Sequence, residues 1–192
     1  MKNLILFLSL LAVAALALPA LAMEHGGERD ADQKFVKKAA LGGLMEVELG
    51  QLAQEKGEAS EVQEFGRRMV EDHGQANSEL SQLAQQKGWE LPTELDQKHQ
   101  NTVDQLQRHS GEEFDQRYMR EMVKDHTKDV RKFEKAKEKV SDPELLAFIE
   151  KTLPVLEEHL QLARQTAEQL GVNVAEAEAE AEEELEEKEE KK

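Results

Sequence analysis

The chain has 192 residues, of which 41 are acidic and 25 basic, so its formal net charge at pH 7 is −16. It has no cysteine, which excludes a disulfide scaffold, a cysteine-ligated metal site and a cysteine nucleophile. The acidic excess argues against non-specific binding to nucleic acid, which relies on Lys and Arg. Beyond residue 22 the sequence is rich in Glu, Gln, Lys, Leu and Ala, which favour helices over strands. We therefore expect one all-α domain.

The first 22 residues have the pattern of a signal peptide. Lys2 supplies a positive charge, residues 4–18 are apolar, and Ala20-Leu21-Ala22 ends in the small-x-small pattern of a cleavage site. The apolar run is shorter than the roughly 20 residues that a membrane span needs. We expect cleavage after Ala22 and export to the periplasm or the extracellular space, with no stable membrane anchor afterwards.

Start and stop signals then divide the chain into helices. Residues 23–31 are expected to form a flexible leader. The expected helices, in chain order, are 32–56, 60–87, a short one within 93–106, 110–140 and 142–170. Their N-terminal signals are Asp32, Ser60 with Gln63, Ser110 with Glu113, and Asp142 before Pro143.

Each of the four long helices carries an apolar stripe at a spacing of three to four residues, which predicts packing around one core. The segment 88–110 is longer than a hairpin connection needs and can cross the length of the bundle. We therefore expect a ferritin-like four-helix bundle over residues 32–171 with a short extra helix in the crossover. An up-down-down-up order is favoured, with a simple up-down order as the alternative.

The C-terminal residues 172–192 form an acidic low-complexity tail. Alanine and glutamate alternate, and then the sequence becomes almost entirely Glu and Lys, with no core-facing stripe beyond Gly171. We expect a solvating extension, either disordered or a fluctuating single helix. Loose binding of cations along the tail is the functional alternative.

One ionisable residue interrupts the apolar stripe of each long helix. These residues are Glu46, His73, His126 and His159. Each lies about midway along its helix, so the four are expected to meet at mid-bundle. One carboxylate and three imidazoles suit a single transition metal ion, which would be Zn²⁺, Fe²⁺, Mn²⁺ or Cu²⁺. The alternative is a hydrogen-bonded polar layer that fixes helix register without a ligand.

A repeat with a constant offset of 53 residues contains two of these histidines. Arg67-x-Met69-Val70-x-Asp72-His73 matches Arg120-x-Met122-Val123-x-Asp125-His126. An Asp directly before each His lies about 100° around the helix, where it can accept the ring N–H of a histidine on a neighbouring helix. We expect Asp72 and Asp125 to orient the histidines in this way.

Several motifs together resemble a known family. They are Leu41-Gly42-Gly43-Leu44-Met45-Glu46-Val47-Glu48-Leu49-Gly50, the two Met-Val-x-Asp-His repeats, and Leu153-Pro154-x-Leu156-x-x-His159-Leu160. They resemble the secreted bacterial family named domain of unknown function 4142, grouped with ferritin-like bundles, over about residues 31–171. The resemblance implies an exported ferritin-like bundle and supports the four site positions, but it implies no activity.

The sequence departs from ferritin-like di-iron proteins, which use Glu-x-x-His motifs. Val70, Val123 and Leu156 stand three residues before the histidines, so ferroxidase or iron-storage activity is not expected.

Three functions stay open. One is metal binding in metal handling or the stress response. Another is a metal-free chaperone-like or envelope-stress interaction protein, and the third is a metal-dependent enzyme. The sequence indicates no catalytic residue. Besides a metal ion, protein clients or a second copy of the chain stay open as partners.

Overall fold

The computed structural model describes residues 21–190, which form six helices and contain no strand. The helices are α1 (Leu21–Lys56), α2 (Ser60–Lys87), α3 (Gln97–Gln107), α4 (Gly111–Lys137), α5 (Pro143–Gln169) and α6 (Val174–Glu190). The predicted all-α class and the short helix in the crossover are confirmed. Residues 1–20, which carry most of the predicted signal segment, lie outside the described residues. Across 21–190, no helix is long and apolar enough to cross a membrane.

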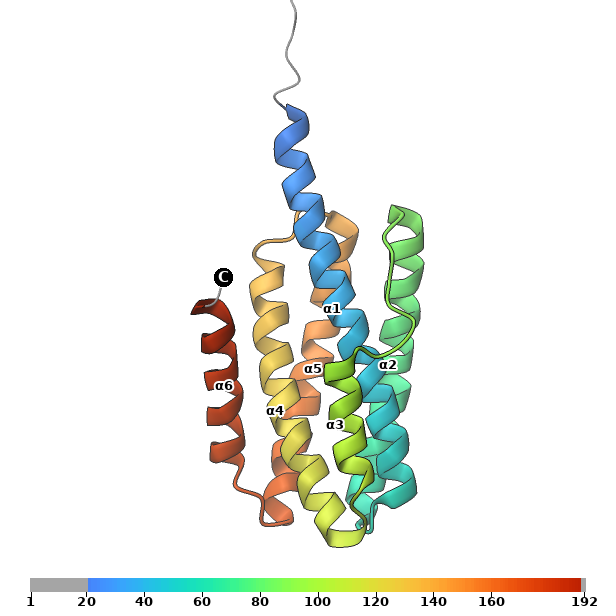
Figure 1. The fold of residues 1–192 in the computed structure, drawn as a ribbon, viewed down its shortest axis with the longest axis vertical. Coiled ribbons are helices and arrows are strands. Elements are labelled where there is room, and N and C mark those ends of the chain that lie inside the picture. The colour runs from blue at the N-terminus through green and yellow to red at the C-terminus, as the bar shows by residue number, and fades with distance from the viewer. Residues whose placement is uncertain (1–20, 191–192) are drawn as a thin grey trace, which may run out of the picture.

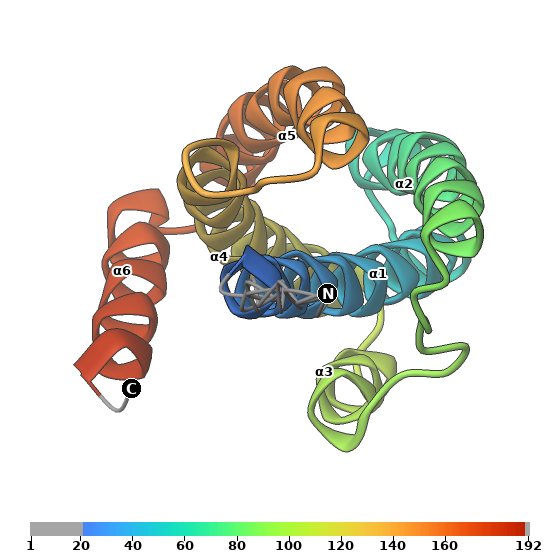
Figure 2. The same cartoon turned by 90° about the horizontal axis from the view of Figure 1, so that it is seen from above.

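Four helices form a ring in the order α1, α2, α5, α4 (Figure 2). In Figure 1, α1 and α5 run downwards, whereas α2 and α4 run upwards. The segment between α2 and α4 returns to the lower end along the outside of the ring and contains α3. The order is therefore down-up-up-down, the order that the length of this segment favoured.

The first helix begins earlier than predicted, and Asp32 does not cap it. Residues 23–31, expected to be a flexible leader, lie within α1. The buried Asp32 carboxylate instead accepts hydrogen bonds from the backbone N–H groups of Ser141, at 3.3 Å, and Asp142, at 3.0 Å, and from the Ser141 hydroxyl. It therefore holds the α4–α5 connection against α1.

A distant carboxylate also replaces the capping box predicted at Ser60. The residue before α2 is Ala59, and no local side chain caps the helix. Asp115 of α4, buried to 1% exposure, accepts the backbone N–H groups of Glu58 and Ala59, the latter at 2.7 Å. The predicted cap of α5 is confirmed, because Asp142 accepts two backbone N–H groups of the first turn at 3.0 Å.

A polar layer divides the hydrophobic core into two clusters. The lower cluster includes Leu49, Met69, Met119 and Ala163, and the upper one includes Val36, Leu80, Phe133 and Ile149. His73, His126 and His159 lie along their helices between the members of the two clusters, and Glu46 borders the lower one. The apolar packing of the ring thus fixes the height of all four residues.

The acidic C-terminal segment is not a solvated extension, contrary to the prediction. It forms α6, which packs along the outer side of α4 (Figure 2). Ala177 and Ala181 are completely buried in this contact. Two alanines one turn apart make a narrow apolar strip that lets two helices approach closely. Alternation of Ala with Glu concealed this strip in the sequence.

Two glycines, Gly50 of α1 and Gly66 of α2, mark a close approach of these helices. A Cβ atom placed on Gly66 would lie 2.7 Å from the carbonyl oxygen of Gly50 and 2.7 Å from Cβ of Ala53. At Gly74, also in α2, an added Cβ would meet no described residue within 4 Å.

We predict that Gly66→Ala lowers the free energy of unfolding by about 2 kcal/mol, because the two backbones must separate. Gly74→Ala is the matched control and is expected to raise it by up to about 1 kcal/mol through helix propensity. Urea denaturation measures both changes. Equal effects of the two substitutions would contradict the close approach.

Candidate metal centre

Three histidines from three helices meet at the middle of the ring. His73 of α2, His126 of α4 and His159 of α5 are exposed by 7%, 1% and 0%. Their ring centroids are separated by 5.3–5.7 Å. One possible ligand atom from each lies within 4.8 Å of the other two. The structure therefore brings together the three histidines that the stripe interruptions singled out.

Hydrogen bonds on the outer side of two rings fix which nitrogen faces inward. His126 Nδ1–H donates to the carbonyl oxygen of Met122, at 2.9 Å, and His159 Nε2–H donates to Asp72 Oδ2, at 2.8 Å. Among the described residues, the buried atoms His73 Nε2, His126 Nε2 and His159 Nδ1 have no hydrogen-bond partner. Because the outer nitrogens of His126 and His159 carry the protons, their inner nitrogens keep free lone pairs.

Burial keeps all three rings neutral. It lowers the pKa of His73 well below its usual range, with further lowering by the neighbouring His126 and His159. Burial likewise lowers the pKa of His126, and it lowers that of His159 to about 4, against the opposing effect of Asp72. Neutral imidazoles are the form that binds metal ions.

Glu46 of α1 borders the lower cluster, where Asp125 and Asp129 act on it, but lies outside this group of ligand atoms. It is 1% exposed, and neither carboxylate oxygen has a hydrogen-bond partner in the described part of the chain. Burial raises the pKa of Glu46 well above its usual range, and the charges of Asp125 and Asp129 raise it further. Burial and these neighbouring charges therefore favour the protonated, neutral form of Glu46.

The repeated aspartates have different partners, so the role predicted for Asp125 is wrong. Asp72 of α2 faces α5 and meets His159 there. Asp125 of α4 faces α1, where the nearby group is Glu46, which has no ring N–H to donate. Asp125 Oδ1 instead forms an ion pair with Lys128 at 2.7 Å. Gln75 stands at the position of Lys128 in the first repeat, so this cation is specific to the second.

Two further residues beside the cluster were missed by the sequence reasoning. Asp129 lies one turn after His126, and its carboxylate acts on both His73 and His126. Although burial opposes this, the pKa of Asp129 is lowered because Lys132 contacts it at 2.6 Å. Its spacing of three residues from His126 was the available signal.

Tyr118, the second missed residue, is completely buried, and its hydroxyl has no partner among residues 21–190. Burial raises the pKa of Tyr118 well above its usual range, and the Glu46 charge adds to this, so the phenol stays protonated.

A crevice of about 30 Å³ borders His73 and is also lined by Gly43, Asn77 and Asp129. Its volume is about that of one water molecule.

Fold and site together define an all-α helical bundle with three histidines buried at its centre. The chain matches the family described as Domain of unknown function (DUF4142) over residues 17–166, and it therefore belongs to that family. No curated protein and no solved structure matches it significantly. The family match includes Glu46 and the three histidines but ends before α6.

We predict that the metal-free protein loses stability as the pH falls from about 6.5 to 4. In this interval the unfolded chain binds a proton at His159 with an ordinary pKa near 6.5, whereas the folded chain does so only near 4, so protons favour unfolding. The loss from this residue is up to about 3 kcal/mol. Urea denaturation at several pH values, with a chelator present, measures it.

The His159→Asn variant is the control, because every other acid-sensitive group is common to both chains. Its free energy of unfolding should fall less steeply over the same interval. Parallel pH profiles for the two chains would show that His159 is not held neutral by burial.

Proposed function

We propose that this protein is an exported ferritin-like bundle that binds one transition metal ion through His73, His126 and His159, and that it serves metal handling. The observation that carries this proposal is the set of three buried imidazole nitrogens without a hydrogen-bond partner in the described chain. The down-up-up-down order supports the ferritin-like assignment. The signal pattern of residues 1–22 supports export.

A metal site accounts for the cluster better than a polar layer does. In a polar layer the four groups would hydrogen-bond to one another, because unpaired buried polar atoms are costly. Here both oxygens of Glu46 and the inner nitrogens lack partners within residues 21–190. The outer hydrogen bonds of His126 and His159 resemble the contacts that orient metal-ligating histidines in general.

The donor set favours Zn²⁺ or Cu²⁺. Imidazole nitrogen suits these ions, and affinity rises along the divalent series towards copper. A tetrahedral ion with metal–nitrogen bonds of about 2.0–2.1 Å places its ligands about 3.3 Å apart. Since the ligand atoms here lie within 4.8 Å of one another, small side-chain rotations bring the rings to bonding distance.

Glu46 is the proposed fourth ligand. A divalent cation in a buried site needs a compensating negative charge. Glu46 is a buried carboxyl group whose two oxygens have no partner in the described chain, and Asp129 acts on it as well as on His73 and His126. The field of the cation favours its ionised form. Four protein ligands close the coordination sphere, which is typical of sites that hold a metal rather than catalyse a reaction.

We predict that the untagged chain binds one equivalent of Zn²⁺ or Cu²⁺ and that the double variant His73→Ala/His126→Ala binds none at this site. Equilibrium dialysis followed by elemental mass spectrometry measures the metal content. Glu46→Gln is expected to weaken binding at least about tenfold without abolishing it, because the three imidazoles are kept.

The matched control is His99→Ala/His109→Ala, which removes two histidines outside the cluster and leaves the acidic α6 unchanged. This control should bind metal as the unaltered chain does. Equal metal content in the unaltered chain and the His73/His126 variant would refute the site.

A further inference from the structure

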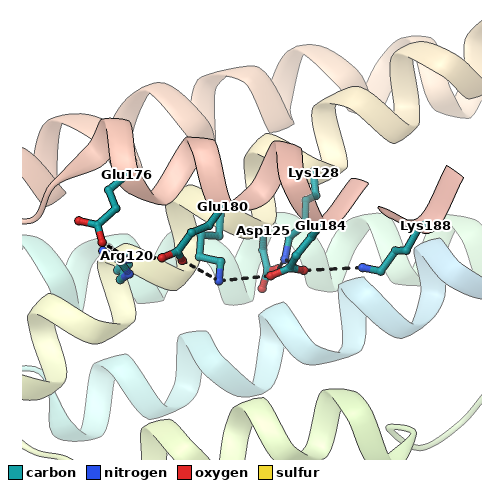
Figure 3. Close-up of polar contacts among 8 residues, drawn as sticks. Arg120, Asp125, Lys128, Glu176, Glu180, Glu184 and Lys188 are labelled. Carbon is teal, nitrogen blue, oxygen red and sulfur yellow. Dashed lines mark hydrogen bonds and ion pairs between the residues drawn. The ribbon is translucent and has the colours of Figure 1, made fainter. Parts of the chain in front are cut away.

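The outer side of α4 carries a continuous row of basic residues. The row recurs every three to four residues and consists of Arg117, Arg120, Lys124, Lys128 and Arg131. We call it the basic stripe. Glu176, Glu180 and Glu184 of α6 recur at the matching spacing, and α6 runs parallel to α4 beside this stripe (Figures 1 and 3).

Ion pairs connect the two helices in register. Arg120 contacts Glu180 at 2.6 Å and Glu176 at 3.3 Å. Lys124 bridges Glu180 and Glu184, at 3.2 and 3.3 Å. Further along, Lys128 reaches Glu184 at 3.4 Å, and Arg131 meets Glu182 at 3.1 Å. Figure 3 shows the ladder from Glu176 to Glu184.

This contact is of a kind that forms and breaks readily. Among the described side chains of α6, only Ala177 and Ala181 are completely buried, so little apolar surface leaves water. The glutamates of the ladder keep 39–56% of their side-chain surface exposed, and salt screens ion pairs at such positions. With 17 residues, α6 is only slightly longer than the roughly 12–15 residues below which isolated helices are marginally stable in water.

The connection between α5 and α6 allows α6 to leave without disturbing the ring. It consists of residues 170–173, with Gly171 in the left-handed conformation at φ 74°. Both hydrophobic clusters are built mainly from α1–α5, to which α6 adds only Ala177 among the fully buried members. A ring that has released α6 therefore presents the basic stripe to solvent.

We propose that the α4–α6 contact is an exchangeable interface through which two copies of this chain associate, each placing its α6 on the basic stripe of the other. A second copy is the occupant because its α6 repeats the same charges and the same alanine strip in the same register.

Within one chain the short tether gives α6 an effective concentration on the order of a millimolar. The monomer therefore dominates in dilute solution, and exchange between copies becomes appreciable as the protein concentration approaches this value. Docking of α6 needs no metal at the histidine cluster.

Two full-length charge-reversed variants test this proposal. One is Arg120→Glu/Lys124→Glu, which makes the stripe repel its own α6. The other is Glu176→Lys/Glu180→Lys, which makes α6 repel its own stripe. Lys128 is left unchanged because it also pairs with the buried Asp125. Each variant alone should be monomeric, with faster hydrogen exchange over residues 174–190 than the unaltered chain.

An equimolar mixture of the two variants at low salt should form a heterodimer, measured by sedimentation, in which the slow exchange over 174–190 returns. The dimer should dissociate at about 0.5 M salt, where the Debye length falls to a few ångströms and ion pairs are weakened. The four-fold variant, which carries both reversals in one chain, is the control and should be monomeric with α6 protected. If both variants keep their helicity but the mixture stays monomeric, the proposal is overturned.

The unaltered chain gives a second test that does not depend on how the variants fold. Its sedimentation at low salt should show a dimer fraction that rises as the protein approaches about a millimolar and disappears at high salt. A strictly monomeric chain over this range, with α6 protected from exchange, would equally overturn the proposal.

Discussion

The arrangement of the molecule depends on placing three neutral imidazoles, with free nitrogens facing one another, inside a helical ring. Each unpartnered buried polar atom costs about 1–3 kcal/mol, so the two apolar clusters above and below the layer must stabilise the fold against this cost. Because the outer nitrogens of His126 and His159 donate hydrogen bonds to Met122 and Asp72, the unpartnered atoms of these two rings are their inner nitrogens. Binding of a cation at these nitrogens would convert the penalty into a stabilising interaction.

The two repeats hold the layer together in different ways. On the α2–α5 side, Asp72 accepts a hydrogen bond from His159 and is itself paired with Arg68. On the α4–α1 side the corresponding neighbours are two acids, Asp125 and Glu46. Lys128 offsets the Asp125 charge and extends the network to Glu184 of α6. The acidic helix outside the ring is thus electrostatically connected to the buried layer within it.

The sequence predicted the long helices and the level of their polar interruptions, both of which follow from helical periodicity. Helical periodicity predicted that His73, His126 and His159 would meet, since residues at the same height of one ring share a layer. The family was also recognisable from its motifs. Spacing could not reveal that Asp32 and Asp115 cap helices other than their own, because those hydrogen bonds join residues far apart in the chain. For the same reason it assigned Asp125 to a histidine and missed the docking of α6, whose alanine strip needs α4 opposite it.

The most direct test of the metal centre is X-ray absorption spectroscopy of the zinc-loaded chain at the zinc edge. Scattering from three imidazole rings per zinc, with nitrogen at about 2.0 Å, together with one oxygen ligand, is the result that the three buried histidines and Glu46 predict. A shell of oxygen atoms with no imidazole scattering would contradict it, because the ion would then be bound by surface carboxylates and the histidine layer would be structural.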